Sequence, residues 1–548
     1  MSGWHSTMRF DRLTLMKAAL VIPIALLCGS LNGRKFYDDD PLWREPSPLR
    51  VEKIEHHELS NSFDFFQNTI AEPGEKQSIR EPIRAEAANT LGEVPDSAWY
   101  RNRDVRAAPL ADLERGPGND HAPSMQAPWQ IIAAKTEGVT PGFRIKDASG
   151  RGYLVKFDPP DDPELATAAD VVGCKFFYAL SYNTPENYIV SFTREQLAIS
   201  PKTAFRDAQG RKRPMKPEDV DRVLTHVPRD PQGRFRAMAS LYISGDITGP
   251  FLYYGTRPDD PNDIVPHERR RDLRGLYVFA AWLNHTDAKS LNSLDTMVTE
   301  NGLKYVKHYL IDFGAILGSG SISAKDVRAG NEYFVDRGPA LARLFTLGIY
   351  APDWERYHYP RVRGVGNFQA KFFNPNVWKT NYPNPAFDNR LPDDTYWAAK
   401  KVMEFSPEQI RTLVSTGEYS DPTAVDYITR TLVERQQKIG KVFFEKILPL
   451  DHFQVEGGNL KFEDLAVTYR FQAPRAYQAH WAKFDNHVNR SAPVEGATGF
   501  SIPSLVRAAA DNDYFAVDIT RDGTTKSMTV YLRRKKGRLE VVGIDRRW

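Results

Sequence analysis

The chain has 548 residues and a mass of 62.3 kDa, which suggests about two to four folded units. Hydrophobic residues make up 41% and charged residues 26%, a globular composition that excludes a disordered chain, a collagen-like chain and a multi-span membrane protein. The net charge of +3 does not favour a polyanion binder, so no nucleic-acid partner is expected. The two cysteines, Cys28 and Cys174, exclude a disulfide framework, a cysteine-rich zinc site and an iron–sulfur cluster.

Residues 1–31 have the pattern of a secretory signal peptide. Basic residues precede a short apolar stretch, 18–31, that is too short to cross a bilayer, for which about 20 residues are needed. The basic residues are Arg9, Arg12 and Lys17. We therefore expect an exported protein, periplasmic or attached to the cell envelope. Membrane attachment through a lipidated Cys28 is one alternative, although Leu27 stands where such signals have Gly or Ala, and an uncleaved anchor is another.

Residues 32–125 form a polar lead-in, rich in Pro, Glu and Arg, that we expect to wrap the next domain. From 126 to 248 the pattern predicts five strands, a single helix after the third strand, and a polar insertion at 194–233. The expected strands are 129–135, 143–147, 153–157, 187–190 and 236–243, and the expected helix is 165–180.

Residues 249–448 are expected to be mainly helical, with a helix at 271–283 and most of 321–447 in helices. Between them, Glu300-Asn-Gly302 predicts the tight turn of a hairpin over 294–311. Ser406 and Asp421 each precede a proline, which is typical of helix starts. Residues 449–548 alternate in the manner of a small all-β domain. The basic run 533–538 is interpreted as a solvated hairpin turn, with contact to anionic lipid or nucleic acid as the alternative.

The loop after 271–283 carries the groups that phosphoryl transfer requires. It reads His285-Thr-Asp287-Ala-Lys289-Ser-Leu-Asn292, and the hairpin that follows ends in Asp312-Phe-Gly314. One carboxylate must receive the proton of the attacking hydroxyl, a cation should offset the charge on the transferred group, and an Asn and a second carboxylate must hold magnesium.

The order H-x-D-x-K-x-x-N, hairpin, D-F-G resembles that of the protein-kinase-like superfamily. The sequence lacks the A-P-E motif and has a long hairpin between Asp287 and Asp312. In both respects it resembles the atypical branch of the superfamily, which includes bacterial persister-toxin kinases and phosphoinositide kinases. The resemblance covers about residues 129 to 320. It implies an α+β fold with two lobes, an antiparallel β N-lobe with one helix and a mainly helical C-lobe, followed here by the C-terminal β domain.

The resemblance also implies roles for individual residues. Asp287 would be the base and Lys289 the phosphoryl-stabilising cation, while Asn292 and Asp312 would be metal ligands. Lys156 in Tyr153-Leu-Val-Lys156 would contact the nucleotide phosphates. The cofactors implied are ATP and Mg²⁺. His285 is expected only to orient its loop, and Cys174 to be a buried small residue.

The partner of Lys156 and the phosphate-covering loop depart from the family pattern. Asp170 is the first candidate for the acid that pairs with Lys156, and Glu164 is the second. The loop between the first two strands lacks G-x-G-x-x-G and offers only Gly138 and Gly142 as nucleotide-binding glycines.

Simpler structural interpretations stay open for four of these residues. The alternatives are a turn cap for Asp312, a solvated loop charge for Lys289, a strand-edge charge for Lys156 and an ordinary helix residue for Asp170.

Three functions follow from the sequence. The first is an exported atypical kinase that moves the γ-phosphoryl group of a magnesium nucleotide to an unknown hydroxyl acceptor. The second is a catalytically inactive kinase-like binding module at the cell envelope, and the third is a nucleotidyl transferase on the same fold. The acceptor, the oligomeric state and the roles of the lead-in and of the β domain do not follow from the sequence.

Overall fold

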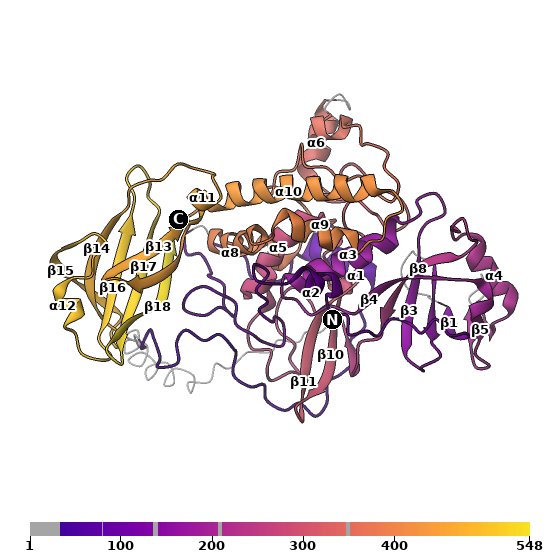
Figure 1. Ribbon diagram of the computed structural model, residues 1–548, viewed down its shortest axis with the longest axis horizontal. Helices are drawn as coiled ribbons and strands as arrows, with labels where there is room; N and C mark the ends of the chain where they lie inside the picture. Colours follow the sequence, from indigo (N-terminus) through magenta and orange to yellow (C-terminus); the bar gives the residue numbers. More distant parts are fainter. Residues whose placement is uncertain (1–32, 79, 135–140, 207–210, 347–350) are drawn as a thin grey trace, which may run out of the picture.

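The structure is a computed structural model that describes residues 33–78, 80–134, 141–206, 211–346 and 351–548 (Figure 1). The predicted signal peptide, Cys28 and Gly138 lie outside these residues. The fold is a mixed α+β arrangement in which helices occupy the middle and β-sheets lie at the two ends (Figure 1). Among the described helices, none has both the length and the apolar character needed to cross a membrane.

The first large sheet has six strands in the order β4-β8-β3-β2-β1-β5. Its strands are β1 (Trp129–Ala134), β2 (Gly142–Lys146), β3 (Gly152–Phe157), β4 (Asn187–Phe192), β5 (Leu197–Ile199) and β8 (Phe235–Leu241). The five predicted strands are confirmed, but the sheet is mixed rather than antiparallel because β5 pairs with β1 in parallel. The insertion supplies β5 and also contains η2 (Arg194–Gln196), β6 (Ala204–Arg206), β7 (Lys212–Pro214) and α4 (Pro217–Thr225). The expectation of a single helix in this region was therefore wrong.

The alternation of β3 decides where its lysine points. Tyr153, Val155 and Phe157 share one hydrophobic cluster with Val220 of α4, so they lie on the α4 side of the sheet. Successive side chains of a strand face opposite sides, and Lys156 consequently projects to the other face. That face is covered by α3 (Leu165–Ala179), which contacts β3, β4 and β8.

The middle of the molecule is built on α5, a helix with every residue buried. It packs against α8 and α10. The helices and short 3₁₀ segments here are η3 (His267–Arg269), α5 (Arg271–Leu283), η4 (Ser290–Asn292), α6 (Arg337–Phe345), η5 (Asp353–Arg356), α7 (Pro385–Asp388), α8 (Pro392–Met403), α9 (Pro407–Ser415) and α10 (Pro422–Phe444). Ser406 and Asp421 accept hydrogen bonds from the first turns of α9 and α10, as their position before proline predicted.

The expectation that 321–447 is mostly helical was wrong for its first half. From 321 to 391 the described backbone is largely irregular, and α6, η5 and α7 are its helical parts. Pro360, Pro375 and Pro383 fall in this stretch, and proline removes a backbone donor and clashes with the preceding helical turn. The sequence between these prolines has helical periodicity, and the prediction from that pattern therefore overestimated the helix content of this stretch.

The predicted hairpin is formed by β10 (Ser293–Glu300) and β11 (Leu303–Leu310), and β9 (Asp246–Gly249) pairs with β10. The turn residues Asn301 and Gly302 have φ of 51° and 77°, the left-handed conformations that a two-residue hairpin turn requires. Because the strands pair without a bulge over their whole length, the residues just before β10 and just after β11 are held side by side.

The C-terminal part has a five-stranded antiparallel sheet, β15-β14-β16-β17-β18, and the β12–β13 pair. The elements are β12 (Leu450–Glu456), β13 (Asn459–Asp464), α11 (Leu465–Thr468), β14 (Gln478–Asp485), β15 (Arg490–Thr498), α12 (Ser504–Arg507), β16 (Tyr514–Thr520), β17 (Ser527–Lys535) and β18 (Arg538–Arg547). It is thus mainly, not wholly, β. The basic run forms the expected hairpin turn, with 535–538 exposed between β17 and β18, and Arg533 is the exception because it is buried and donates to Tyr37 O at 2.8 Å.

The lead-in crosses all of these parts. It contains α1 (Asn61–Phe66), the π-helical turn η1 (Gln67–Ala71) and α2 (Leu110–Arg115). Phe36 packs in a cluster of the C-terminal sheet, Val51 N donates to Lys304 O of β11 at 2.8 Å, and Tyr100 lies in the central core.

Candidate active site

Lys156 forms ion pairs with two carboxylates. Its Nζ lies 2.9 Å from Asp170 Oδ2 and 2.7 Å from Asp312 Oδ1. Burial by itself would lower the pKa of Lys156, but attraction to Asp170 and then to Asp312 outweighs it, and the pKa is raised. The side chain therefore stays charged at neutral pH in a place where a bare ammonium group would be costly.

Asp170 connects α3 to the turn that contains Asp312. Besides Lys156, its carboxylate accepts the Asn187 amide at 3.0 Å and the backbone N–H of Phe313 at 3.2 Å. The side chain is fully buried, so each of these bonds replaces a lost contact with water. Asp170 thus fixes the lysine from one side and the Asp-Phe-Gly turn from the other.

The second acid candidate, Glu164, is placed elsewhere. It lies at the N-terminal cap of α3 in a left-handed conformation, and its carboxylate accepts from Arg363 at 3.1 Å and from Ser420 N at 2.9 Å. Gly142, by contrast, is the direct strand partner of Lys156 in the β2–β3 pair, so the end of the predicted phosphate-covering loop lies beside the lysine.

The Asp-Phe-Gly turn is anchored by its phenylalanine. Phe313 is fully buried and stacks on Phe177 of α3 with ring centroids 5.0 Å apart. A Cβ on Gly173 would lie 2.7 Å from Phe313 Cβ, so a glycine is needed at this point of α3. Asp312 has φ of 60°, an uncommon conformation for a residue with a side chain that the packing of Phe313 and the bonds of Asp170 maintain.

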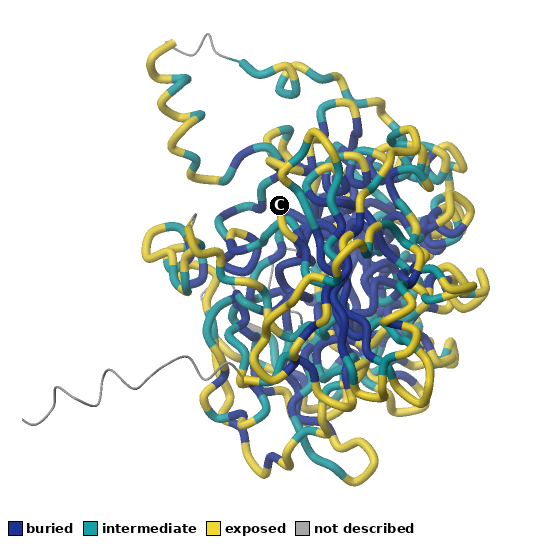
Figure 2. The backbone as a smooth tube through the Cα atoms, turned by 90° about the vertical axis from the view of Figure 1, so that its left-hand side faces the viewer, coloured by how far each residue is buried: buried dark blue, intermediate teal, exposed yellow. Residues whose placement is uncertain are grey.

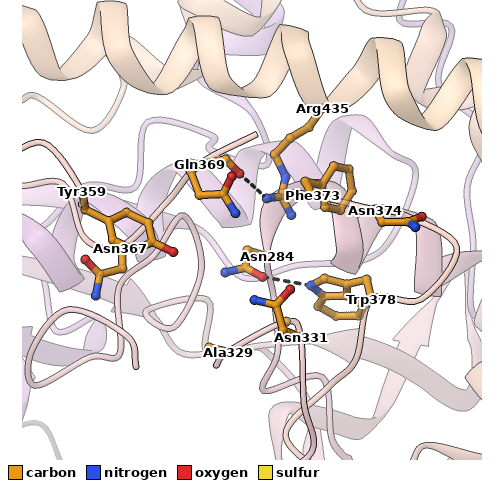
Figure 3. Close-up of a pocket in the computed structure, with 11 residues that line it drawn as sticks. Asn284, Ala329, Asn331, Tyr359, Asn367, Gln369, Phe373, Asn374, Trp378 and Arg435 are labelled. Carbon is orange, nitrogen blue, oxygen red and sulfur yellow. Dashed lines mark hydrogen bonds between the residues drawn. The ribbon is translucent and has the colours of Figure 1, made fainter. Parts of the chain in front are cut away.

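The loop 284–292 begins where α5 ends. Asn284 closes the helix in a left-handed conformation, and its side chain accepts from Trp378 Nε1 at 2.9 Å. Arg435 of α10 donates to Trp282 O at 2.9 Å and also to Ala281 O, both carbonyls of the last turn of α5. Figure 3 shows Arg435 and the Asn284–Trp378 bond in a polar pocket behind the loop. The loop therefore starts from a rigid helix end.

Asp287 is held by three neighbours. Lys289 Nζ lies 3.0 Å from Oδ1, the Asn292 amide donates to Oδ2 at 2.9 Å, and the Asn381 amide donates to Oδ1 at 3.1 Å. The Asn292 amide also donates to the backbone oxygen of Asp287 at 2.8 Å. The side chains of Asp287 and Lys289 are partly exposed, at 23% and 18%, so the carboxylate is both oriented and reachable.

The hairpin brings the two predicted metal ligands together. Ile311 N donates to Asn292 O at 3.0 Å, which extends the β10–β11 pairing by one residue and places Asp312 beside Asn292. Because the Asn292 amide nitrogen points to Asp287, its oxygen points away from that carboxylate. The arrangement joins Asn292, Asp312 and, through Asp312, Lys156.

The donor set fits a hard cation held jointly with a bound nucleotide. Within the described ranges there is no group of three or more His, Cys, Asp or Glu side chains arranged to hold a metal ion. A carboxylate from Asp312 and an amide oxygen from Asn292 supply two oxygen ligands, and nucleotide phosphates would supply others, which is how magnesium is usually bound. The residues are compatible with that arrangement and would not form a metal site alone.

Two residues that no sequence motif marks also contact the loop. Lys325 is buried, and its Nζ donates to Asn284 O at 2.8 Å and to Thr286 Oγ1 at 2.7 Å. Asn381 binds Asp287 through its amide and Thr286 O through its backbone N–H at 2.7 Å. Both come from the irregular 321–391 stretch, far along the chain from the loop, and no local motif marks them.

His285 has the structural position that was expected of it. It is buried, and burial followed by repulsion from Lys325 lowers its pKa to about 4, so the imidazole is neutral at pH 7. Cys174 is also buried, its pKa is raised to about 12 by burial, and its Sγ donates to Pro185 O at 2.9 Å. The neutral imidazole of His285 is not in the form of a general acid, and the protonated thiol of Cys174 is not in the form of a nucleophile.

Comparison with known proteins gives a weak likeness to kinases. No protein-family model and no curated protein matches the chain. Two crystal structures of the Golgi casein kinase, one with Mn/ADP bound, are similar at 9% and 11% identity with TM-scores of 0.30, over 61% of this chain and 73% and 76% of theirs. The Helicobacter pylori proinflammatory kinase CtkA is similar at 12% identity and a TM-score of 0.30, over 58% of this chain and 98% of its own. Because these scores are low, the functional proposal below rests on the geometry of the residues.

Proposed function

We propose that the protein is an atypical kinase-like phosphotransferase that moves the γ-phosphoryl group of a magnesium nucleotide to a hydroxyl acceptor. One observation carries this proposal. Lys156, Asp170, the Asp287–Asn292 loop and Asp312 come from four separate segments, and hydrogen bonds and ion pairs connect them into one site. The fold behind it, a β-lobe with its lysine facing α3 and a helical lobe carrying the loop, is the arrangement that such a reaction uses.

The residues divide the work as follows. Lys156, held by Asp170, would bind the nucleotide phosphates, with the end of the covering loop at Gly142 beside it. Asp312 and Asn292 would hold magnesium, which when bound offsets charge on the phosphates. Asp287 Oδ would accept the proton of the acceptor hydroxyl, and Lys289, 3.0 Å from it, would offset charge on the transferred group.

A non-catalytic binding module is the second candidate, and one contact favours it. In the structure the carboxylate of Asp312 is paired with Lys156, the residue expected to bind phosphate. A protein that keeps this pair in the presence of nucleotide would retain the fold without the reaction. Export, predicted from residues 1–31, also belongs to the proposal, and it is consistent with either candidate; the mass of the mature protein from its host would test it.

Transfer of a labelled γ-phosphoryl group separates the two candidates. The purified full chain should release or transfer label from Mg·ATP to itself, to water or to a hydroxyl acceptor in host extract. Asp287→Asn should lower the rate by about 10²- to 10⁴-fold, because it removes the proton acceptor. Asp326→Asn, an exposed carboxylate outside the site, should leave the rate unchanged. No transfer by the wild-type chain, or an unchanged rate in Asp287→Asn, would contradict the phosphotransferase.

A further inference from the structure

The α6 helix projects from the body of the molecule and carries an apolar surface. It lies above α10 in Figure 1, and Figure 2 shows it as exposed or intermediate along its length. No residue of α6 is buried. Its large apolar side chains are among the most exposed of the described chain: Leu341 at 52%, Leu344 at 67% and Phe345 at 82%.

The spacing of these side chains puts them on one face. Positions 341, 344 and 345 are separated by three and four residues, so they lie together along one side of a helix. Phe334 and Val335, just before the helix, are also more than half exposed. Scattered apolar residues are normal on a protein surface, but five exposed ones within the twelve residues 334–345 of a protruding element mark an interaction site.

The charges around this surface suit an anionic or zwitterionic layer. Arg343 pairs with Glu332 at 2.9 Å and also lies 3.6 Å from Glu355, and Asp336 pairs with Lys379, so each of these acids faces a basic side chain. Arg337, at the start of α6, is exposed. A short helix with Leu and Phe on one face, an exposed arginine at its start and each of these acids facing a basic side chain has the character of a helix that lies in a membrane interface.

The surface is connected to the candidate active site. Phe334 N donates to Asn381 O at 2.7 Å, and the Asn381 amide binds Asp287. Asn381 alone thus separates Phe334, the first apolar residue of the surface, from the candidate base Asp287. The surface is therefore joined by hydrogen bonds to the loop that carries the candidate base.

We propose that Phe334, Val335 and the Leu341–Leu344–Phe345 face of α6 form a lipid-contact surface that seats the protein on a bilayer. Insertion into the interface would bury side chains that are exposed in the isolated chain, and Arg337 would lie at the level of the lipid phosphates. The acceptor would then be a molecule presented at that bilayer. This last clause rests on the proposed function, whereas the lipid contact itself does not.

Vesicle binding tests the proposal without any nucleotide, so its failure is distinguishable from failure of the phosphotransferase. The full chain is mixed with phosphatidylcholine vesicles, with and without phosphatidylglycerol, and the bound fraction is measured by flotation. The double variant Leu341→Asp, Leu344→Asp should bind at least about tenfold more weakly, because two apolar groups are replaced by charges that the interface rejects. The matched control, Ile264→Asp, changes a side chain that is 80% exposed elsewhere and should bind as wild type does.

Two further measurements show whether a change in vesicle binding comes from the surface itself. The thermal unfolding midpoints of both variants should equal that of the wild type, since the replaced side chains are exposed. Equal vesicle binding by the double variant and the control would overturn the proposal, and so would no binding by the wild-type chain. If the double variant instead lowers the mass of the protein in light scattering and leaves vesicle binding unchanged, the surface joins two copies of the chain and the lipid proposal is wrong.

Discussion

The Nζ atom of Lys156 lies 2.7 Å from Oδ1 of Asp312, although the two residues are 156 positions apart. Asp170, on the other side of the lysine, also binds the backbone of Phe313, so three segments close on one point. The single positive charge of the lysine is therefore shared between two carboxylates. Binding of a nucleotide with a cation would replace the Lys156–Asp312 pair by a lysine–phosphate contact and a carboxylate–metal contact. Each charged group would then keep a partner of opposite charge.

Removal of the Asp170 carboxylate should lower both the stability of the protein and its affinity for nucleotide. Asp170→Ala leaves Lys156 buried with only Asp312 as partner and strands the Asn187 amide, so we expect a loss of about 3 kcal/mol in the free energy of unfolding. Nucleotide affinity should fall as well, because the lysine loses its orientation. Glu164→Ala is the control, since it breaks bonds of a buried carboxylate to Arg363 and Ser420, neither of which contacts Lys156, and should leave nucleotide affinity unchanged. Equal affinities in the two variants would show that Asp170 is an ordinary helix residue.

Gly173→Ala should displace the Asp-Phe-Gly turn. The added Cβ would lie 2.5 Å from Ile316 Cδ1 and 2.7 Å from Phe313 Cβ, closer than packed atoms approach. We expect a destabilisation of about 1 to 3 kcal/mol and weaker binding of nucleotide, because the Asp170–Phe313 bond must lengthen. Gly338→Ala, in α6, meets no atom closer than 3.9 Å and should be neutral or slightly stabilising. Chemical denaturation of both variants tests the difference.

Lys325 should act as a positioning residue for the loop. Its Nζ holds Asn284 O and Thr286 Oγ1, the residues that lead into Asp287. Lys325→Met keeps the apolar stem and removes the donor, so the loop loses its support, and the maximal transfer rate should fall about tenfold or more while nucleotide affinity stays near wild type. A fall in affinity alone would assign Lys325 to the nucleotide rather than to the loop.

The same lysine predicts a pH dependence of stability. Burial lowers the pKa of Lys325 to about 7, although attraction to Asp287 opposes the shift, while an unfolded lysine titrates near 10.4. Between these values the unfolded state binds a proton that the native state lacks, so this contribution to stability increases with pH from about 7 to about 10. The wild type should gain roughly 2 kcal/mol relative to Lys325→Met between about pH 7 and about pH 9. Urea unfolding at the two pH values checks the sign, and a parallel pH dependence in both proteins would refute it.

The sequence predicts the parts of this structure in which local pattern and packing agree. Alternation in 153–157 and apolar periodicity in 271–283 correspond to β3 and α5, and Asn301-Gly302 forms the predicted tight turn. A bulge-free hairpin connects Asn292 to Asp312, and Ile311 N donates to Asn292 O at its open end. The tight turn predicted at 300–302 is the local signal from which this return of the chain follows.

Other features depend on contacts between distant segments and have no local signal. Lys325 and Asn381 reach the loop from an irregular stretch whose path is set by prolines and by tertiary hydrogen bonds. The parallel pairing of β5 with β1 arises from an insertion that looked like a polar loop. Arg533 appears in a basic run typical of a solvated turn, yet the lead-in supplies carbonyls that bury it.

Calorimetric titration of the full chain with ATP, in the presence and absence of magnesium, tests the central claim most directly. The site as built predicts saturable binding that requires magnesium, weakens at least about tenfold in Asp312→Asn through loss of a metal ligand, and is nearly unchanged in Asp287→Asn. Absence of nucleotide binding to the wild-type chain, or equal magnesium-dependent affinity in wild type and Asp312→Asn, would contradict it.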